Sequence, residues 1–141
     1  MKQELVRDWM TREVITISPE TSLAEAHKLM TEKRVRRLPV VDHDQIVGIV
    51  TLGDVRGAEP SRASSLSVWE MNDLLAKLKV AEIMSRDPIT IQQNTNIGEA
   101  AQIMLEKKFS GLPVVDEADH LVGIITESDI FRLVANEWSK D

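Results

Sequence analysis

The sequence predicts an α+β protein built from two tandem copies of a β-α-β-β-α unit, related by a pseudo-two-fold axis, with a helical insertion between them. Two observations carry this prediction. When Met10 is set against Met84, residues 10–42 align with residues 84–116 without a gap, and 16 of the 33 aligned pairs are identical. After one additional residue in the second copy, the match resumes and continues to Asp54 and Asp129. Self-similarity of this extent indicates a duplicated structural unit.

Each copy carries the same series of local signals: a β-branched run, a polar residue three before a glutamate, apolar residues at helical spacing, and a proline that opens a second strand. In the first copy these predict a strand at Val14–Ile17, a helix after Ser22, a strand from Pro39, a strand at Ile46–Val50 and a helix after Thr51. The equivalents in the second copy are Ile89–Ile91, Asn96, Pro113, Leu121–Ile125 and Thr126.

The connection between the copies is long and has two parts. Residues 57–65 are rich in small and turn-forming residues and are expected to form a loop. A capping box at Ser67 and Glu70 then predicts a linker helix over about residues 67–79, with apolar residues along one face. That face is expected to pack on the protein itself or, alternatively, on a partner. We therefore expect a first repeat at 1–57, a linker at 58–79 and a second repeat at 80–141, forming one compact module.

Composition narrows the possible functions. The chain has 141 residues and a formal net charge of −6, which disfavours binding to nucleic acid or to an anionic membrane. It has no cysteine, so disulfides and thiolate metal sites are excluded. No apolar run is long enough to cross a membrane, and the N-terminus lacks the hydrophobic stretch of a secretory signal. We therefore expect a soluble, cytoplasmic protein.

The sequence offers no catalytic or metal-binding constellation. His27, His43 and His120 lack metal-ligand spacing and are expected at the surface. A glycine-rich phosphate loop and a G-x-S-x-G nucleophile motif are both absent. We therefore predict that the chain is not an enzyme, uses no catalytic cofactor and holds no metal.

A T-x-x-D element recurs at equivalent positions, as Thr51 with Asp54 and as Thr126 with Asp129. A carboxylate can accept hydrogen bonds from both hydroxyls of a ribose. A hydroxyl at a helix start, beside free backbone amides, can donate to a phosphate. The same pattern is also a capping box, in which threonine caps the helix and the acid reaches back to an amide. Both interpretations stay open, and one site can serve both.

These residues together resemble a CBS repeat. The second copy carries the resemblance from Met84 to Ile91, in Ser110-Gly111-Leu112-Pro113-Val114-Val115-Asp116, and from Gly123 to Asp129; the first carries it from Met10 to Ile17, in Leu38–Asp42 and in Gly48–Asp54. The two copies cover nearly the whole chain outside the linker, so the chain resembles a CBS domain pair, or Bateman module. The helical insertion is similar to that of stand-alone CBS proteins of the acetoin-utilisation type.

The resemblance implies clefts between the repeats that take adenosine-containing ligands. AMP, ADP or ATP is expected, with S-adenosylmethionine less so. It also implies a homodimer. By the family pattern, Asp54 and Asp129 would contact the ribose, and Thr51 and Thr126 would contact phosphate.

The residues that precede the second strand differ between the copies. The resemblance places this point at the phosphate end of the cleft, so Arg36 and Arg37 are candidate phosphate contacts, since arginine forms paired hydrogen bonds to phosphate oxygens. In the second copy the corresponding candidate phosphate contacts are Ser110 and Gly111, which carry no charge; Gly111 would allow close backbone approach. The two sites therefore need not be equivalent, and a polyphosphate suits the arginine side better.

An adenine ring would need an apolar slot. The candidates lie in the predicted first strands: Ile15, Thr16, Ile89 and Thr90. For the isoleucines, the alternative is ordinary core packing. The resulting hypothesis is a regulatory module that senses an adenosine nucleotide and acts on an unidentified partner protein. The alternative is a protein-protein interaction module with unoccupied pockets, which the linker helix, Trp69 and Trp138 motivate.

Overall fold

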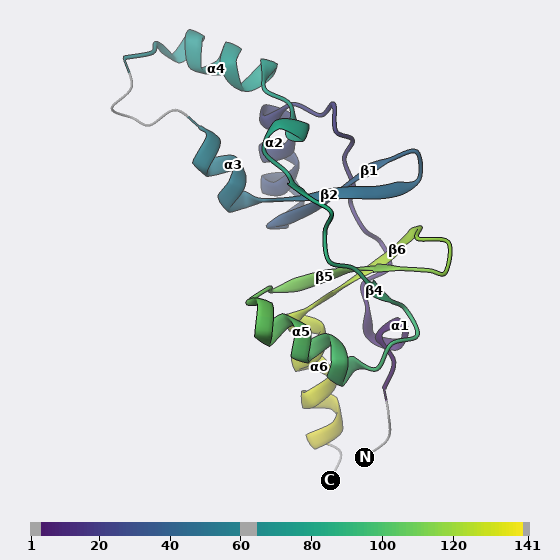
Figure 1. The fold of residues 1–141 in the computed structure, drawn as a ribbon. Coiled ribbons are helices and arrows are strands. Elements are labelled where there is room, and N and C mark those ends of the chain that lie inside the picture. Colours follow the sequence, from purple (N-terminus) through teal and green to yellow (C-terminus); the bar gives the residue numbers. More distant parts are fainter. Residues whose placement is uncertain (1–3, 60–64, 140–141) are drawn as a thin grey trace. The chain divides into compact units, whose positions relative to one another are not determined.

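The computed structural model describes residues 4–59 and 65–139, which form two compact units (Figure 1). One of them, here called the Asp54 unit, spans Ile15–Pro88. The other, the Asp129 unit, joins the residues up to Val14 to those from Ile89 onward. Each unit therefore contains most of one sequence copy and the leading segment of the other copy. The loop expected at residues 57–65 lies partly outside the described residues, at 60–64.

The Asp54 unit contains an antiparallel sheet and helices. Its strands, in the order β1-β2-β3, are β1 (Arg37–Asp42), β2 (Gln45–Thr51) and β3 (Ser85–Arg86). Its helices are α2 (Leu23–Lys33), α3 (Leu52–Ala58), α4 (Val68–Lys77) and a short 3-10 helix (Val80–Glu82). Helix α2 packs against both α3 and α4 (Figure 1).

The Asp129 unit contains a mixed sheet in the order β4-β5-β6, in which β4 is parallel to β5 and β6 is antiparallel to it. The strands are β4 (Ile91–Gln92), β5 (Gly111–Val115) and β6 (Leu121–Thr126). The helices are α1 (Val6–Trp9), α5 (Ile97–Lys107) and α6 (Glu127–Trp138). The third strands and the last helix of each copy form where the sequence predicts them, whereas the second strands begin at Arg37 and Gly111, two residues before the prolines predicted to open them.

The strand predicted at Val14–Ile17 is wrong as a continuous element. Only Ile17 is paired: its amide donates to the Pro39 carbonyl at 3.1 Å, and its carbonyl accepts from the Val41 amide at 2.8 Å. Extending this parallel ladder back to Ile15 would require an amide hydrogen on Pro39, and proline has none.

The first strand of the second copy is displaced for the same reason. The sequence predicts it at Ile89–Ile91, whereas β4 covers Ile91–Gln92, with Ile91 opposite Val114. Pro113 lies at the position where a longer ladder would need an amide donor. Pro39 and Pro113, each the third residue of its strand, thus limit the length of the first strands.

The predicted starts of the long helices are confirmed. Ser22 caps α2, its hydroxyl accepting from the Glu25 amide at 3.1 Å, and Asn96 caps α5, its side chain accepting from the Gly98 amide at 2.6 Å. Both helices end in a residue in the left-handed region, Arg34 with φ 56° and its equivalent Lys108 with φ 60°.

The predicted linker helix is confirmed as α4, which is slightly shorter than expected. Ser67 and Glu70 form the capping box, with bonds of 3.1 and 3.4 Å. Leu75 and Leu78 pack against the core of the Asp54 unit. Val68 and Trp69, at the start of the helix, are 70% and 85% exposed. Only part of the apolar face therefore packs on the protein.

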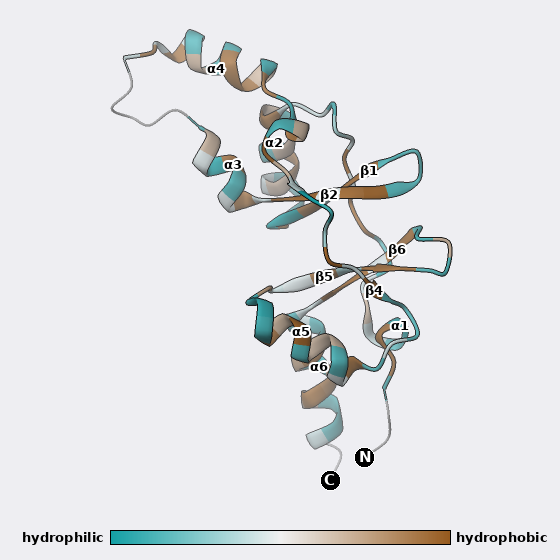
Figure 2. Cartoon of the chain, in the orientation of Figure 1, coloured by the Kyte–Doolittle hydropathy of each residue, from teal (hydrophilic) through white to brown (hydrophobic). Residues whose placement is uncertain are grey.

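Each unit has its own hydrophobic core. The strands of the β1–β2 hairpin are hydrophobic and its turn is hydrophilic (Figure 2). Helices α2 and α5 bury equivalent residues at helical spacing: Leu23, Ala26 and Met30 in one, Ile97, Ala100 and Met104 in the other. These residues pack against buried strand residues, such as Leu38, Val40 and Val50 in the Asp54 unit and Leu112, Val114 and Ile125 in the Asp129 unit.

The leading segment of each copy completes the sheet or core of the unit that holds the other copy. In the Asp54 unit, β3 from the start of the second copy pairs with β2. In the Asp129 unit, Thr11 from the start of the first copy bridges Ile124, with a 2.9 Å hydrogen bond in each direction. The preceding methionines, Met84 and Met10, are buried in the corresponding cores. The duplicated sequence thus folds with a reciprocal exchange of its leading segments.

Two equivalent glycines make room for this exchange. A Cβ built on Gly48 would lie 2.6 Å from Sδ of Met84 and 2.9 Å from the backbone oxygen of the residue after it. The same two distances recur at Gly123 against Met10 and the residue after it. The backbone oxygens belong to the paired leading segments, so they cannot retreat without loosening that pairing.

Gly123→Ala and Gly48→Ala are therefore each expected to lower the free energy of unfolding by about 1–3 kcal/mol, the usual cost of overfilling a packed site. Gly57→Ala in α3 is the matched control, because a Cβ there meets nothing within 4 Å. It should be neutral or stabilising by up to about 1 kcal/mol, since alanine favours a helix. Urea unfolding followed by circular dichroism measures all three. Equal stabilities for the three variants would contradict this account.

Candidate functional site

The predicted site residues of the first copy converge where β1 begins and β2 ends. Arg37, the first residue of β1, lies opposite Thr51, the last residue of β2. The amide of Leu52, the first residue of α3, donates to the carbonyl of Arg36 at 2.7 Å. This bond ties the start of the helix to the residue before the strand. Arg36, Arg37, Thr51 and Asp54 therefore lie together within the Asp54 unit.

Thr51 and Asp54 form a capping box. The Thr51 hydroxyl accepts from the Asp54 amide at 3.1 Å, and Oδ2 of Asp54 accepts from the Thr51 amide at 2.9 Å. Within the described part of the chain, Oδ1 of Asp54 accepts no hydrogen bond, and the Thr51 hydroxyl donates none. One carboxylate oxygen and one hydroxyl hydrogen thus stay available while the cap is intact.

The two arginines differ in their surroundings. Arg36 is exposed, and its side chain has no hydrogen bond or ion pair with any residue in 4–59 or 65–139. Arg37 is partly buried, as expected for a residue paired in β1. Arginine side chains in the same segment as an open carboxylate oxygen suit a ligand that carries both phosphate and sugar hydroxyls.

The second copy repeats the backbone arrangement. Gly111 lies opposite Thr126 in the β5–β6 pair, and the Glu127 amide donates to the Ser110 carbonyl at 3.1 Å. Gly111 is buried and Ser110 is partly buried. The predicted residues Ser110, Gly111, Thr126 and Asp129 are therefore together in the Asp129 unit, as their equivalents are in the Asp54 unit.

The side chain of Asp129 accepts more hydrogen bonds than that of Asp54. It is 1% exposed, and Oδ2 accepts from both the amide and the hydroxyl of Thr126, at 2.9 and 3.1 Å. Oδ1 accepts from Nη2 of Arg132 at 2.6 Å and from the Thr11 hydroxyl at 3.5 Å. Both oxygens of this carboxylate are therefore occupied by partners within the chain.

Sequence reasoning missed Arg132 and Thr11 as neighbours of Asp129. A signal for Arg132 existed, since residues three apart on a helix face the same side and Arg132 follows Asp129 by three. The contact with Thr11 comes from the exchange of leading segments, which no local pattern indicates.

The proposed base-pocket residues lie in the extended segments that precede the first pairings. Ile15 packs at the edge of the core of the Asp54 unit, and Thr16 next to it is exposed. In the Asp129 unit Ile89 is 40% exposed and Thr90 is partly buried. Thr16, Ile89 and Thr90 are thus accessible to some degree, whereas Ile15 also serves the core.

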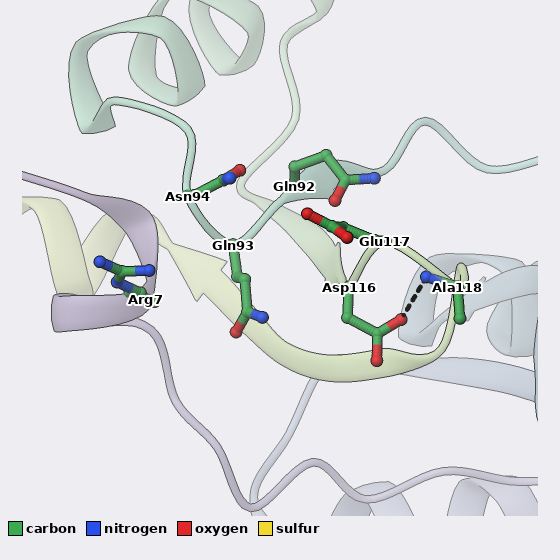
Figure 3. A pocket seen from close by; sticks show the side chains of 7 residues that line it. All are labelled: Arg7, Gln92, Gln93, Asn94, Asp116, Glu117 and Ala118. Carbon is green, nitrogen blue, oxygen red and sulfur yellow. Dashed lines mark hydrogen bonds between the residues drawn. The ribbon is translucent and has the colours of Figure 1, made fainter.

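Surface hollows also occur away from these residues in the described part of the chain. One, of about 390 Å³, is polar and lies beside α1, β4 and the turn after β5 (Figure 3). In it Arg7 lies across from the loop of Asp116, whose carboxylate accepts from the Ala118 amide at 2.9 Å. Another, of about 440 Å³, lies between α2 and Leu75 of α4 and is bordered by His27 and Glu59. Neither hollow is lined by a predicted ligand-binding residue.

The three histidines pair with nearby acids. His27 lies 2.7 Å from Glu59 and is partly buried, while the exposed His43 and His120 lie 3.1 Å from Asp42 and 3.8 Å from Asp116. Among residues 4–59 and 65–139, no group of three or more histidine or acidic side chains could hold a metal ion. In the same residues, no helix combines the length and the apolar character that crossing a membrane requires.

Curated relatives match most of this chain, but the share of each relative's own length that the match covers varies widely. An inosine-5′-monophosphate dehydrogenase from Korarchaeum cryptofilum is 39% identical over 123 residues, 87% of this chain and 23% of that enzyme. A CBS domain-containing protein from Dictyostelium discoideum is 35% identical over 131 residues, 92% of this chain and 90% of that protein. The chain thus spans only about a fifth to two fifths of the length of several relatives, the dehydrogenases among them.

Solved structures with the same fold include ligand complexes. CBSX2 from Arabidopsis thaliana in complex with AMP has a TM-score of 0.80 at 31% identity, covering 95% of this chain and 98% of that one. The CBS domain pair of protein MJ0100, in complex with 5′-methylthioadenosine and S-adenosyl-L-methionine, has a TM-score of 0.78 at 31% identity, covering 96% and 99%. A putative acetoin utilization protein from Vibrio cholerae has a TM-score of 0.80 at 30% identity, covering 98% and 95%.

The two sequence copies coincide with two matches to one family. Residues 6–61 and residues 80–136 each match the CBS domain. The duplicated strand–helix pattern, the paired T-x-x-D elements and the likeness to solved CBS pairs agree with this match. The chain belongs to the CBS domain family, of which it carries a pair of repeats.

Proposed function

We propose that this protein is a regulatory module that binds an adenosine nucleotide through its T-x-x-D elements. The observation that carries the proposal is the first-copy site, where, among the described residues, one carboxylate oxygen of Asp54 and the hydroxyl hydrogen of Thr51 stay open and the backbone of Arg36 is bonded to the start of the same helix. Similar proteins of known structure were solved with AMP or with S-adenosyl-L-methionine and 5′-methylthioadenosine, which all contain adenosine.

In this proposal the residues keep the roles that the family pattern implies. Asp54 and Asp129 contact the ribose. Phosphate contacts come from Thr51, Thr126, Arg36, Arg37, Ser110 and Gly111. The base lies near Ile15, Thr16, Ile89 and Thr90. These groups supply the chemistry such a ligand requires: carboxylate acceptors for hydroxyls, cationic and hydroxyl donors for phosphate, and partly apolar surface for the ring.

AMP, ADP or ATP fits the first-copy site better than S-adenosylmethionine. Arg36 and Arg37 supply positive charge next to Thr51, and the phosphates of a nucleotide carry the complementary charge. S-adenosylmethionine carries a sulfonium and an ammonium cation beside a single carboxylate, so it offers the arginines less negative charge than the phosphates of a nucleotide do.

The proposed activity is binding that changes the protein's behaviour, without turnover. A nucleotide that binds one conformation more tightly shifts the population towards it, and a partner protein reads the shift. We further propose a cytoplasmic homodimer with no affinity for nucleic acid or membrane, in keeping with the net charge of −6.

A second candidate function, a protein-protein interaction module, is favoured by exposed apolar side chains. Phe131, Val134 and Trp138 recur at helical spacing on α6 and are 66%, 46% and 74% exposed. Trp69 at the start of α4 is also exposed. Exposed groups of this kind are typical of contact surfaces, between copies of the chain or with another protein.

Isothermal titration of the purified chain with AMP, ADP and ATP tests the leading proposal. Binding of at least one nucleotide is expected, with affinity falling as salt rises because arginine–phosphate attraction is screened. S-adenosylmethionine, titrated in parallel, should bind more weakly and with less salt dependence. Absence of heat with all four ligands would remove the proposal and leave the interaction module as the better explanation.

Asp54→Ala separates ligand binding from helix capping. It should weaken nucleotide binding by at least about tenfold, since a hydrogen bond to a charged group is lost, and should lower stability by about 1 kcal/mol through loss of the cap. Glu70→Ala is the matched control, because it breaks the equivalent half of the capping box of α4. It should reduce stability similarly and leave nucleotide affinity unchanged. If Asp54→Ala changes only stability, as the control does, Asp54 is a cap and not a ligand contact.

A further inference from the structure

We infer that Arg132 blocks the ligand-binding acid of the second copy, so that the two T-x-x-D sites are unequal and Asp54 binds nucleotide first. This inference rests on the proposed function and deepens it, because it names the copy that binds and the residue that decides between the copies. It follows from comparing two sites that share a backbone arrangement and differ in a few side chains.

The Asp129 carboxylate has no oxygen left for a sugar. Four donors from the chain surround it, two on each oxygen, and the shortest contact is the 2.6 Å ion pair with Arg132. The hydroxyl hydrogen of Thr126, which would otherwise serve a phosphate, also points to Asp129. The Thr126 hydroxyl is therefore bonded to Asp129, and the Asp129 carboxylate is bonded to both Thr126 and Arg132.

Arg132 is held in this position by a second acceptor. Its Nη2 also donates to the backbone oxygen of Trp9, at 3.3 Å. Trp9 immediately precedes the exchanged segment that brings Thr11 to the same carboxylate. A ribose could reach Asp129 only by displacing a charged hydrogen bond from Arg132 and a hydroxyl from Thr11.

The Asp54 site lacks this block because the position equivalent to Arg132 is Gly57. Both residues lie three positions after the acid on the last helix of their copy. A Cβ at Gly57 would meet nothing within 4 Å, and glycine offers no guanidinium to the acid three residues before it. Asp54 accepts one hydrogen bond, from the Thr51 amide, and keeps Oδ1 open in the described part of the chain.

The positive charges thus lie at different points of the two copies, beside the acid in the second and at the start of the second strand in the first. In the second copy Arg132 neutralises the acid that should contact the sugar, and uncharged Ser110 and Gly111 lie at the start of β5. In the first copy the acid has no cationic partner among the described residues, and Arg36 and Arg37 lie at the start of β1. Only the first copy combines an open sugar acceptor with nearby positive charge for phosphate.

Titration with AMP, with stoichiometry as the readout, tests this inference. The wild-type chain should bind one AMP tightly, and any second AMP at least about tenfold more weakly, the cost of displacing a charged hydrogen bond. Arg132→Ala should release Asp129 and give a second site whose affinity rises towards that of the first. Lys107→Ala, which removes an exposed cation from the same unit, is the charge-matched control and should behave as wild type.

The reciprocal variant introduces an arginine at the equivalent position of the first copy. Gly57→Arg places a guanidinium three residues after Asp54, in open space, and should weaken the tight site by at least about tenfold. Gly57→Gln is the control for side-chain bulk without charge and should retain most of the affinity. Because this pair does not alter the buried Asp129 site, it tests the inference even if Arg132→Ala folds poorly, which circular dichroism would reveal.

The outcomes separate the inference from the proposed function. Two wild-type sites of equal affinity, or weaker binding in Arg132→Ala with its fold intact, would overturn the inference while nucleotide binding stands. No change in Gly57→Arg relative to Gly57→Gln would overturn it as well. If neither wild type nor any variant binds AMP, ADP or ATP, the proposed function fails and the inference falls with it.

Discussion

The exchange of leading segments is the constraint on which the rest of the structure depends. Short strands cannot build a stable sheet by themselves, and each unit recruits its missing edge from the start of the other copy. The exchange requires a residue without a side chain where the segments meet, and Gly48 and Gly123 provide it. It also carries Thr11 to Asp129, so the fold itself brings a distant hydroxyl to a candidate binding residue.

The same duplication that makes the fold symmetric leaves its candidate sites unequal. Strand starts, helix starts and the T-x-x-D elements recur in both copies, because the copies share the same strand pairing and the same positions of capping side chains. The side chains around them differ, with Gly57 in one copy and Arg132 in the other. A shared framework therefore fixes where a ligand could bind, while a single helix position governs whether the acid is accessible.

Much of the fold could be predicted from the sequence because it depends on local signals. The caps at Ser22 and Asn96 and the hairpins after the two prolines arise from residues close together in the chain. The sequence predicts first strands that are too long, because their pairing with the second strands stops where a proline, Pro39 or Pro113, has no amide hydrogen to donate. The duplication also predicts which residues of each copy share one backbone arrangement, because the same strand pairing and helix start recur in both copies. The duplication does not indicate Arg132, because the equivalent position in the first copy is Gly57 and the two copies therefore share no residue there.

The central claim is that Asp54 meets the ligand while its helix cap persists, and that Asp129 stays closed by Arg132. The most direct measurement is the shift of the backbone amide resonances of Thr51 and Thr126 during an AMP titration, because each amide donates to its copy's acid. The account predicts that the Thr51 resonance moves and saturates with the tight binding event, while the Thr126 resonance is unchanged at that point. A Thr126 shift that saturates first, or no shift of either amide at saturating AMP, would contradict it.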